Sequence, residues 1–525
     1  MSLHNVSISD NDHAVNLLFS VVVCWFGIIG LALAIPPRFA AIFADHMVVQ
    51  RGVPIPVWGW ADPEAQVTVS FSGQTQSATA GKDGKWTVRF APLECPQDNP
   101  GQSLSARSEA EVTTLSDILI GDVWICGGQS NMAFKLSRAT NGPAAAAAAS
   151  HPLIRICDVS GKRTGPNDAP PVDLEPAAWK IASPTSAADF SAIAYFFAEN
   201  LQSSISVPIG LVDTSVGGTA MKSWMSREVM AADPILKAEV LRDDEAMAQF
   251  PQRMEDYHRK LESYQQRANN EKQPARKPTA PKGPDSSYRL SYLHASVIRT
   301  LQPFAIKGVI WYQGEADAGR HAIFQHQFAT LVGEWRREWG QGEFPWLYVQ
   351  LAPYSKAEGR LFPRVWEAQT RAQTIPNSAM IVALDHGISD NIHPPDKQAV
   401  GERLALAARG LAYHETVSWR SPFFKSMEKQ GSDLVVHFDA IGDGLSAADP
   451  ELKYVSVAGS DRKFLPASAR LMPGNTLLVN HPEIKDPIAV RYGWYAAGDP
   501  VGASIFGKNG LPVAPFRSDD WPEEP

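Results

Sequence analysis

Apolar and polar residues alternate along the first part of the chain with the period of a β-strand. In "QVTVSFSG" (residues 66–73) every second position up to Phe71 is apolar, and "KWTVRF" (85–90) repeats the pattern directly after Asp83-Gly84. A period of two places the apolar side chains on one face of a strand, and Asp-Gly is a typical hairpin turn. We therefore predict an N-terminal β-sandwich over residues 37–117.

Short apolar runs alternate with helical patterns between residues 118 and 415. The runs are "DVWIC", "LIRIC", "IGLVDTS", "VIWYQ", "WLYVQL" and "MIVAL". Helical spacing is clearest in "FATLVGEWRREW", in which the apolar residues are Phe328, Leu331, Val332, Trp335 and Trp339. Strands that alternate with helices are typical of a parallel sheet covered by helices on both faces. The pattern predicts an α/β domain over residues 118–415.

Two other regions depart from this alternation. Residues from about 230 to 285 begin as a charged helix and end in a Pro/Lys-rich stretch, which predicts an exposed insertion in the α/β domain. From about residue 416 the chain returns to short strands separated by Gly, Pro, Asn and Asp, such as "DLVVHF", "TLLVN" and "PIAVRYGW". We expect a C-terminal β-domain over residues 416–525.

The N-terminus carries an uncharged apolar run from Ala14 to Ala34. It ends in Ala32-Leu33-Ala34, a small-x-small pattern suited to cleavage by signal peptidase. The run is long for a signal core and no Lys or Arg precedes it, so a retained membrane anchor is the alternative. Residues 1–36 are therefore predicted to be a signal peptide or a membrane anchor. Either one places the rest of the chain outside the cytoplasm, in the periplasm or in the medium.

Charge and cysteine content limit the partners. The formal net charge of −8 counts against nucleic acid and anionic membrane surfaces as main partners. The chain has 4 cysteines, no CxxC motif and no Cys/His cluster, so we predict no structural zinc site. The sequence makes no prediction of oligomeric state.

The motifs that carry chemistry follow predicted strands. "CGGQSNM" (126–132) places Ser130 directly after the first strand of the α/β domain, and "SDNIHPPDK" places Asp390 and His393 after the last. A serine becomes a nucleophile when a histidine removes its proton, and a carboxylate usually holds that histidine. Because parallel strands end at one edge of a sheet, Ser130 and His393 are expected to lie at a common site.

Acyl transfer also requires N–H donors for the oxyanion that forms. "DTSVGGT" offers the backbone N–H groups of Gly217 and Gly218, and "WYQGEAD" offers the side-chain amide of Gln313, each just after a predicted strand. Taken alone, the glycines are explained by a tight turn and Gln313 by a surface amide. Together, four loops supply the parts that one mechanism needs.

Two rival functions remain open on the sequence. A glycoside hydrolase would use Glu315 with Asp317 or Asp390 as its carboxylate pair. A carbohydrate-binding protein would hold glycan on its β-domains and would have no active centre. Both rivals leave the serine and histidine motifs unexplained.

Longer motifs carry a family resemblance. Gly-x-Ser-Asn, then glycines, an amide and Asp-x-x-His resemble the SGNH hydrolase pattern. More narrowly, "LIGDVWICGGQSNM", "VDTSVGGTAMKSW", "IKGVIWYQGEADAGR" and "DNIHPPDKQAVGERLALAA" resemble the sialate O-acetylesterase family of carbohydrate esterases. The N- and C-terminal regions also resemble that family, so the likeness covers most of the chain from about residue 40.

The resemblance implies an SGNH, flavodoxin-like catalytic domain, a role for each matching residue, and an acetylated carbohydrate as the substrate. Ser130 would be the nucleophile, His393 the general base and Asp390 the acid that orients it, with no metal or cofactor. The oxyanion hole would be formed by the N–H of Ser130, the N–H of Gly218 or Gly217, and the Gln313 amide.

Two acidic residues bear on these roles. Glu315 is a second carboxylate that could pair with His393, and its alternative role is to brace its loop. Asp317 stands where the family often has Asn. The substrates that the resemblance implies are esters of sialic acid or other acetylated glycans such as xylan.

Overall fold

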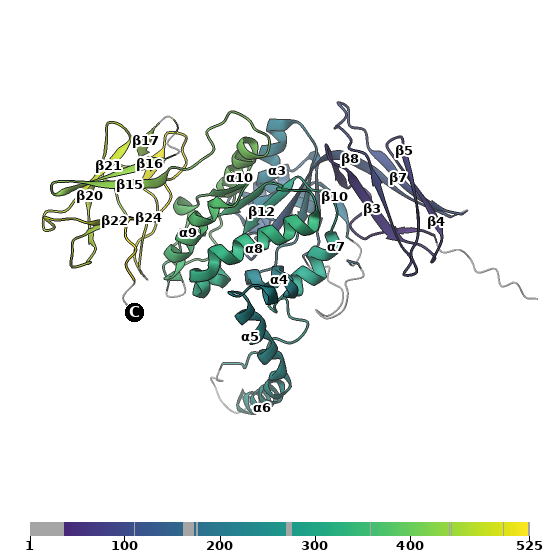
Figure 1. Cartoon of the computed structure of the whole chain (residues 1–525), viewed down its shortest axis with the longest axis horizontal. Helices are drawn as coiled ribbons and strands as arrows, with labels where there is room; N and C mark the ends of the chain where they lie inside the picture. The colour runs from purple at the N-terminus through teal and green to yellow at the C-terminus, as the bar shows by residue number, and fades with distance from the viewer. Residues whose placement is uncertain are drawn as a thin grey trace, which may run out of the picture.

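The computed structural model describes residues 36–109, 111–160, 173–174, 177–268, 276–356, 359–439, 442, 444–496 and 498–522. A central α/β domain lies between an N-terminal and a C-terminal β-domain, and the three form a row (Figure 1). The predicted signal or anchor segment, apart from residue 36, lies outside the described residues. No helix within the described ranges is both long enough and apolar enough to cross a bilayer.

The N-terminal domain is built from two antiparallel sheets. One contains β1 (Arg38–Phe39), β3 (Ile55–Trp60) and β6 (Lys85–Phe90), and the other contains β5 (Gln74–Thr79), β4 (Gln66–Phe71), β7 (Gln102–Ser108) and the first part of β8 (Glu111–Gly128). The apolar residues of β4 and β6 are buried and their neighbours are more exposed, as the alternation predicted. The strand β2 (Val48–Gln50) pairs with the middle of β8.

Strand β8 belongs to two domains at once. Its 18 residues begin polar and half-exposed beside β7, and from Ile118 onward every residue is buried. The second half pairs with β11 and β12 of the central sheet. The predicted boundary at residue 117 therefore falls inside one continuous strand.

The central sheet has the strand order β10-β9-β11-β8-β12-β13-β14. The strands not yet introduced are β9 (His151–Asp158), β10 (Trp179–Ala182), β11 (Ile209–Asp213), β12 (Gly308–Tyr312), β13 (Trp346–Val349) and β14 (Ser378–Ile381). Six strands run parallel, including all six predicted ones, but β10 is antiparallel to β9. The sheet is mixed rather than purely parallel.

Helices cover both faces of this sheet. Trp124 of β8 packs on Phe197 of α3 (Ala192–Ile205), whereas Trp311 of β12 packs on Trp335 of α8 (His321–Trp339). Trp311 is paired with Gly127, which lies three residues after Trp124 on β8. Successive side chains of a strand point to opposite faces, so the two tryptophans lie on opposite faces of the sheet. Helix α10 (Gln398–Leu411) packs beside α3, and α9 (Phe362–Arg371) packs beside α8 (Figure 1). All five apolar residues predicted to form the buried face of α8 are buried.

The insertion projects from the central domain. Its helices are α4 (Arg227–Ala232), α5 (Lys237–Ala248) and α6 (Phe250–Ala268), and α5 and α6 extend away from the sheet (Figure 1). The shorter helices are η1 (Leu136–Arg138), α1 (Gly142–Ala148), α2 (Pro184–Ala188), η2 (Met221–Trp224), η3 (His294–Ile298), α7 (Arg299–Leu301), η4 (Glu315–Arg320), η6 (Ala372–Thr374) and η7 (Leu384–His386).

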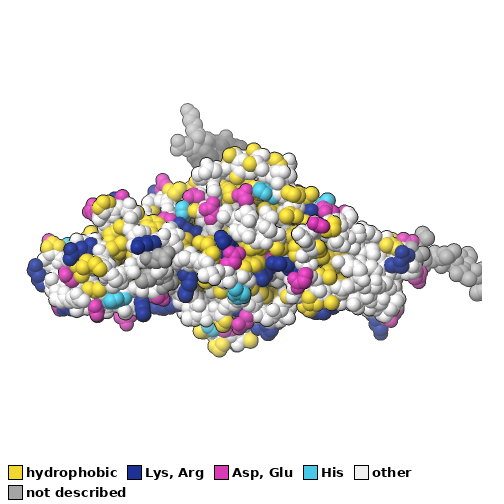
Figure 2. Space-filling view, turned by 90° about the horizontal axis from the view of Figure 1, so that it is seen from above, with side chains coloured by type: hydrophobic (Ala, Val, Ile, Leu, Met, Phe, Trp, Pro, Cys, Tyr) yellow, Lys and Arg dark blue, Asp and Glu magenta, His cyan; other side chains and the backbone are white. Residues whose placement is uncertain are grey.

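The C-terminal domain consists of antiparallel sheets, as its short strands predicted. Their orders are β15-β16-β21-β20, β17-β23 and β19-β18-β22-β24. The bounds are β15 (Phe423–Gln430), β16 (Asp433–Asp439), β17 (Leu445–Ala447), β18 (Val455–Ala458), β19 (Leu465–Pro466), β20 (Ser468–Met472), β21 (Thr476–Asn480), β22 (Ala489–Tyr492), β23 (Ile505–Gly507) and β24 (Phe516–Arg517). Acidic and basic side chains are interspersed on the face seen in Figure 2.

Candidate active site

The predicted site residues follow strands that end at the same edge of the central sheet. Ser130 lies two residues beyond β8, Gly217 follows β11 and Gln313 follows β12 directly. The strands β11 and β12 flank β8 on its two sides, so the strand order reverses at β8. Open α/β sheets form their binding crevice at such a reversal, beyond the carboxyl ends of the strands.

Ser130 and His393 lie in direct contact, although 263 residues separate them in sequence. The distance from His393 Nε2 to Ser130 Oγ is 2.8 Å, which is a hydrogen bond. The turn that presents the serine depends on Gly128, whose φ of 129° suits glycine and whose added Cβ would lie 2.1 Å from the Tyr312 carbonyl oxygen. The geometry is that of a hydroxyl nucleophile with a base in hydrogen-bond reach.

The other ring nitrogen of His393 has no carboxylate partner among the described residues. Asp390 is exposed and forms neither a hydrogen bond nor an ion pair with His393. Asn391 Oδ1 accepts a hydrogen bond from the backbone N–H of His393 at 3.0 Å, and this bond closes the turn. The structure therefore brings the serine and the histidine together but leaves Asp390 outside the pair, and its orienting role stays a prediction.

The charges near His393 are positive. Burial is the largest cause that lowers the pKa of His393, and the positive charges of Lys397 and Arg138 lower it further. The imidazole therefore stays neutral to lower pH than an ordinary histidine. A neutral imidazole is the form that accepts a proton from Ser130.

The loop that contains Gly217 and Gly218 lies beside Ser130, and the oxyanion role of its N–H groups stays a prediction. A Cβ added to Gly217 would lie 3.5 Å from Ser130 Cβ, and Gly218 has a φ of 73°. Within the described residues, the N–H groups of Ser130, Gly217 and Gly218 donate to no protein acceptor. They are free for a substrate oxygen.

Gln313 is engaged elsewhere. It is buried, and its Nε2 donates to the Thr219 carbonyl oxygen at 3.2 Å and to the Asp317 carboxylate. Both amide hydrogens therefore already form hydrogen bonds, and the side chain supports the loop of residues 217–219. The oxyanion role of Gln313 stays a prediction, and it requires the amide to leave one of its two acceptors.

Asp317 cannot act with Glu315 as a glycosidase pair in this arrangement. Asp317 is fully buried, and its oxygens accept from the Met221 N–H at 2.9 Å, from Gln313 and from Arg320 at 2.8 Å. A carboxylate with every oxygen bonded to a protein donor is structural. The glycoside-hydrolase alternative thereby loses its Glu315–Asp317 pair.

Glu315 bonds to Asn131 rather than to His393. Asn131 Nδ2 donates to Glu315 Oε1 at 2.5 Å and to the Ile392 carbonyl oxygen at 3.1 Å, while Asn131 Oδ1 accepts from Lys397 Nζ at 2.6 Å. One amide thus ties together the serine loop, the β12 loop and the histidine loop. Sequence reasoning missed Asn131 and Lys397, although Asn131 directly follows the nucleophile in the motif.

Glu315 and Lys397 are an enclosed pair of opposite charges. Burial raises the pKa of Glu315, and its Oε2 has no hydrogen-bond partner among the described residues. Burial lowers the pKa of Lys397 to about 7, although Glu315 and Asp396 oppose this shift. Asn131 bonds to both members of the pair and so connects them to the residue next to Ser130.

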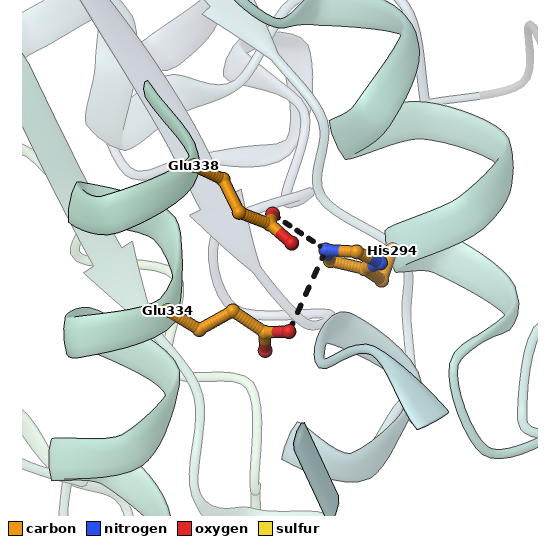
Figure 3. A group of neighbouring side chains, drawn as sticks. All are labelled: His294, Glu334 and Glu338. Carbon is orange, nitrogen blue, oxygen red and sulfur yellow. Dashed lines mark hydrogen bonds and ion pairs between the residues drawn. The ribbon is translucent and has the colours of Figure 1, made fainter. Parts of the chain in front are cut away.

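A separate group on α8 has the residue types of a metal site (Figure 3). His294 Nε2 lies 2.8 Å from Glu338 Oε2 and 3.9 Å from Glu334 Oε1. Both Glu334 oxygens accept from the Ser226 N–H, and Gln302 donates to Glu338. Protein donors already bond to both oxygens of Glu334 and to Glu338 Oε2, so we interpret the group as a structural link between α8 and η3.

Known proteins resemble the chain over nearly its whole length. The family described as "carbohydrate esterase, sialic acid-specific acetylesterase" matches residues 120–267 and 286–409, which is just over half of the chain. The chain belongs to this esterase family. The resemblance noted from the motifs is thereby confirmed, and with it the class of carboxylic-ester hydrolase.

Individual relatives agree with the family. Sialate O-acetylesterase of Mus musculus is 28% identical over 91% of this chain and 93% of its own length, and the Homo sapiens protein is 27% identical over 87% of each chain. The crystal structure of a carbohydrate acetylesterase from Xanthomonas citri superposes with a TM-score of 0.77 at 32% identity, covering 92% of this chain and all of that one. This coverage includes both β-domains of the present chain.

Proposed function

We propose that this esterase removes O-acetyl groups from carbohydrates, with Ser130 as nucleophile and His393 as general base. The 2.8 Å hydrogen bond between Ser130 Oγ and His393 Nε2 is the observation that carries the proposal. The family and the named relatives support the acetylated sugar as substrate. Esters of sialic acid and acetylated plant or bacterial glycans are the candidate substrates.

The reaction proceeds through an acetyl-enzyme. Ser130 Oγ attacks the acetyl carbonyl carbon while His393 Nε2 takes the hydroxyl proton. The tetrahedral intermediate expels the sugar oxygen, which takes that proton from His393. Water, deprotonated by the same histidine, then attacks the acetyl-serine, and acetate leaves as Ser130 recovers its proton.

The oxyanion is stabilised by the N–H groups of Ser130 and of Gly218 or Gly217. Their lack of protein acceptors supports this role, since preorganised free donors are what a developing oxyanion needs. Asp390 is proposed to orient His393 by approaching Nδ1 when substrate binds, because catalytic hydrogen bonds are often incomplete in the free enzyme. The Gln313 amide would donate to the oxyanion as a third N–H only after breaking its hydrogen bond to Thr219 or to Asp317.

The domain is proposed to be an SGNH hydrolase of the flavodoxin-like type. In the sheet, the strands β11, β8, β12, β13 and β14 lie side by side in that order. When these five are numbered along the chain, with β8 as 1, the order reads 2-1-3-4-5, which is the flavodoxin-like order. The strands β9 and β10 extend the sheet beyond β11. The chain is further proposed to act outside the cytoplasm, released or tethered by its N-terminal segment. The uncharged run from Ala14 to Ala34 supports that location.

Replacement of the nucleophile tests the function. Ser130→Ala is expected to lower kcat for acetate release from 4-nitrophenyl acetate and from an acetylated sialoside by up to ~10⁶-fold. Ser203→Ala, at an exposed serine of α3, is the matched control and should keep wild-type turnover. Near-native hydrolysis by the Ser130 variant would remove the assignment.

A further inference from the structure

A groove beside the active site has no role in the chemistry described above. It measures 680 Å³ and lies between the helices α5 and α6, the segment 278–282, and Tyr288 with Arg289. These elements belong to the insertion and to the chain that returns from it. Helices α5 and α6 form the projection below the central domain in Figure 1.

The wall of this groove is also a neighbour of the catalytic loop. A Cβ added to Gly218 would lie 3.1 Å from the ring of Tyr288, and Gly217 is next to Ser130. On the groove side, Lys282 Nζ lies 3.5 Å from the centroid of the same ring. Tyr288 therefore lies between Lys282 and the loop of Gly217 and Gly218 that contacts Ser130.

Positive charges line the groove in excess. The acidic residues of the lining are already matched, because Asp243 pairs with Arg289 at 3.0 Å and Asp256 pairs with Arg259. Among the described residues, the lining cations Lys282 and Arg253 form no ion pair with an acidic side chain, whereas the charge of Lys260 acts on Asp256. Burial lowers the pKa of Lys282, and the nearby charge of Lys222, which itself pairs with Glu239 at 3.5 Å, lowers it further.

We propose that this groove is a subsite for the carboxylate of an acidic sugar, with Lys282 as its main recognition residue. Tyr257 supplies an aromatic face for the apolar side of a sugar ring, Tyr288 holds the Lys282 ammonium group over its own ring, and Lys282 and Arg253 supply the charge that a carboxylate requires. A neutral glycan would leave these cations without partners. The inference deepens the proposed esterase function and rests on it.

The lining of the subsite lies partly inside and partly outside the family match. The family match covers residues 120–267 and 286–409, so Lys282 and its flanking prolines lie in the gap between them. The catalytic residues lie inside the matched ranges. The other charged and aromatic lining residues, such as Arg253, Tyr257 and Tyr288, also lie inside the matched ranges.

A charge-specific kinetic comparison tests the subsite. Lys282→Gln is expected to lower kcat/KM about 10-fold, mainly through KM, for acetyl esters of a sialoside and of a uronic-acid-bearing xylo-oligosaccharide, since a charge-assisted hydrogen bond contributes ~1.5 kcal/mol. The variant should leave neutral acetylated xylo-oligosaccharide and 4-nitrophenyl acetate unchanged, and Lys282→Arg should retain most of the preference for the acidic esters. Lys180→Gln, at an exposed lysine of β10, is the control. An equal loss on acidic and neutral esters, or no loss on either, would overturn the proposal.

Binding separates this inference from the esterase assignment. Ser130→Ala protein should bind free sialic acid or a glucuronyl xylo-oligosaccharide in calorimetry, and Ser130→Ala combined with Lys282→Gln should bind each about 10-fold more weakly. The loss should shrink in 0.5 M salt, which screens exposed charges. If the wild-type protein hydrolysed no acetyl ester, the proposed function would fail while this comparison still decided the subsite. Equal binding by the two proteins would refute the subsite alone.

Discussion

The charges around His393 set the pH range in which it accepts a proton from Ser130. Burial and the cations of Lys397 and Arg138 lower the pKa of His393, so activity should be lost on acidification only below the ordinary histidine value of about 6.5. Burial lowers the pKa of Lys397 to about 7, so its positive charge grows as the pH falls through that range, and Glu315 and Asp396 are the acidic groups that face it. Lys397→Met removes this charge, so the pKa of His393 should rise and the acidic limb of kcat/KM should move to higher pH.

A second lysine gives the control for this pH profile. Lys307 is also partly buried and precedes β12, at the edge of the sheet away from the site. Lys307→Met should leave the acidic limb in place, whatever it does to stability. A limb that stays fixed in Lys397→Met, or moves equally in both variants, would show that Lys397 acts only through packing.

Single residues differed in how far the sequence could identify them. Ser130, His393 and the glycines could be predicted as site residues because each lies in a recognisable motif in the segment after a predicted strand. Asn131 and Lys397 were missed because their importance depends on contacts between loops far apart in sequence. Asp390 has the expected spacing, yet the Asn391 side chain shapes the turn and leaves Asp390 exposed, which spacing alone does not reveal.

At the scale of elements, the end of β8 places strict demands on backbone conformation. Gly128 combines a positive φ with close contact to the Tyr312 backbone, so Gly128→Ala should lower the free energy of unfolding by about 3 kcal/mol and misplace Ser130. Gly333 is exposed in the middle of α8 and has open space around an added Cβ. Gly333→Ala should therefore raise the free energy of unfolding by about 1 kcal/mol. Urea unfolding of both variants, together with kcat, checks the pair. Equal stability in the two variants would contradict the proposed constraint at β8.

Element prediction succeeded where a segment is buried and strongly patterned. The six parallel strands and helix α8 carry apolar runs or helical spacing that tertiary packing preserves. Strand β10 was missed because its four residues, "WKIA", have buried ends and an exposed middle. That pattern fits neither a half-buried strand nor a fully buried one, and the strand exists because β9 offers it an edge.

At the scale of the whole molecule, Asp122 joins the N-terminal and central domains. This buried carboxylate of β8 accepts from Gln50 at 2.8 Å, from Arg51 at 3.0 Å and from the hydroxyl of Tyr413 at 2.9 Å. Gln50 belongs to β2, and Tyr413 follows α10, so three parts of the chain depend on one side chain.

Because β8 is shared, the two domains should unfold as one cooperative unit. Asp122→Ala leaves Arg51 and its other donors without their acceptor, so it should lower the free energy of unfolding by about 3 kcal/mol. Hydrogen exchange measured along a guanidinium series should show β6 of the N-terminal domain and β12 of the central sheet losing protection at a common midpoint, shifted down together in the variant. Asp98→Ala, at an exposed aspartate of the same N-terminal region, should leave that midpoint unchanged. Loss of protection in β6 well before β12 would mean that β8 passes between two independently stable domains rather than coupling them.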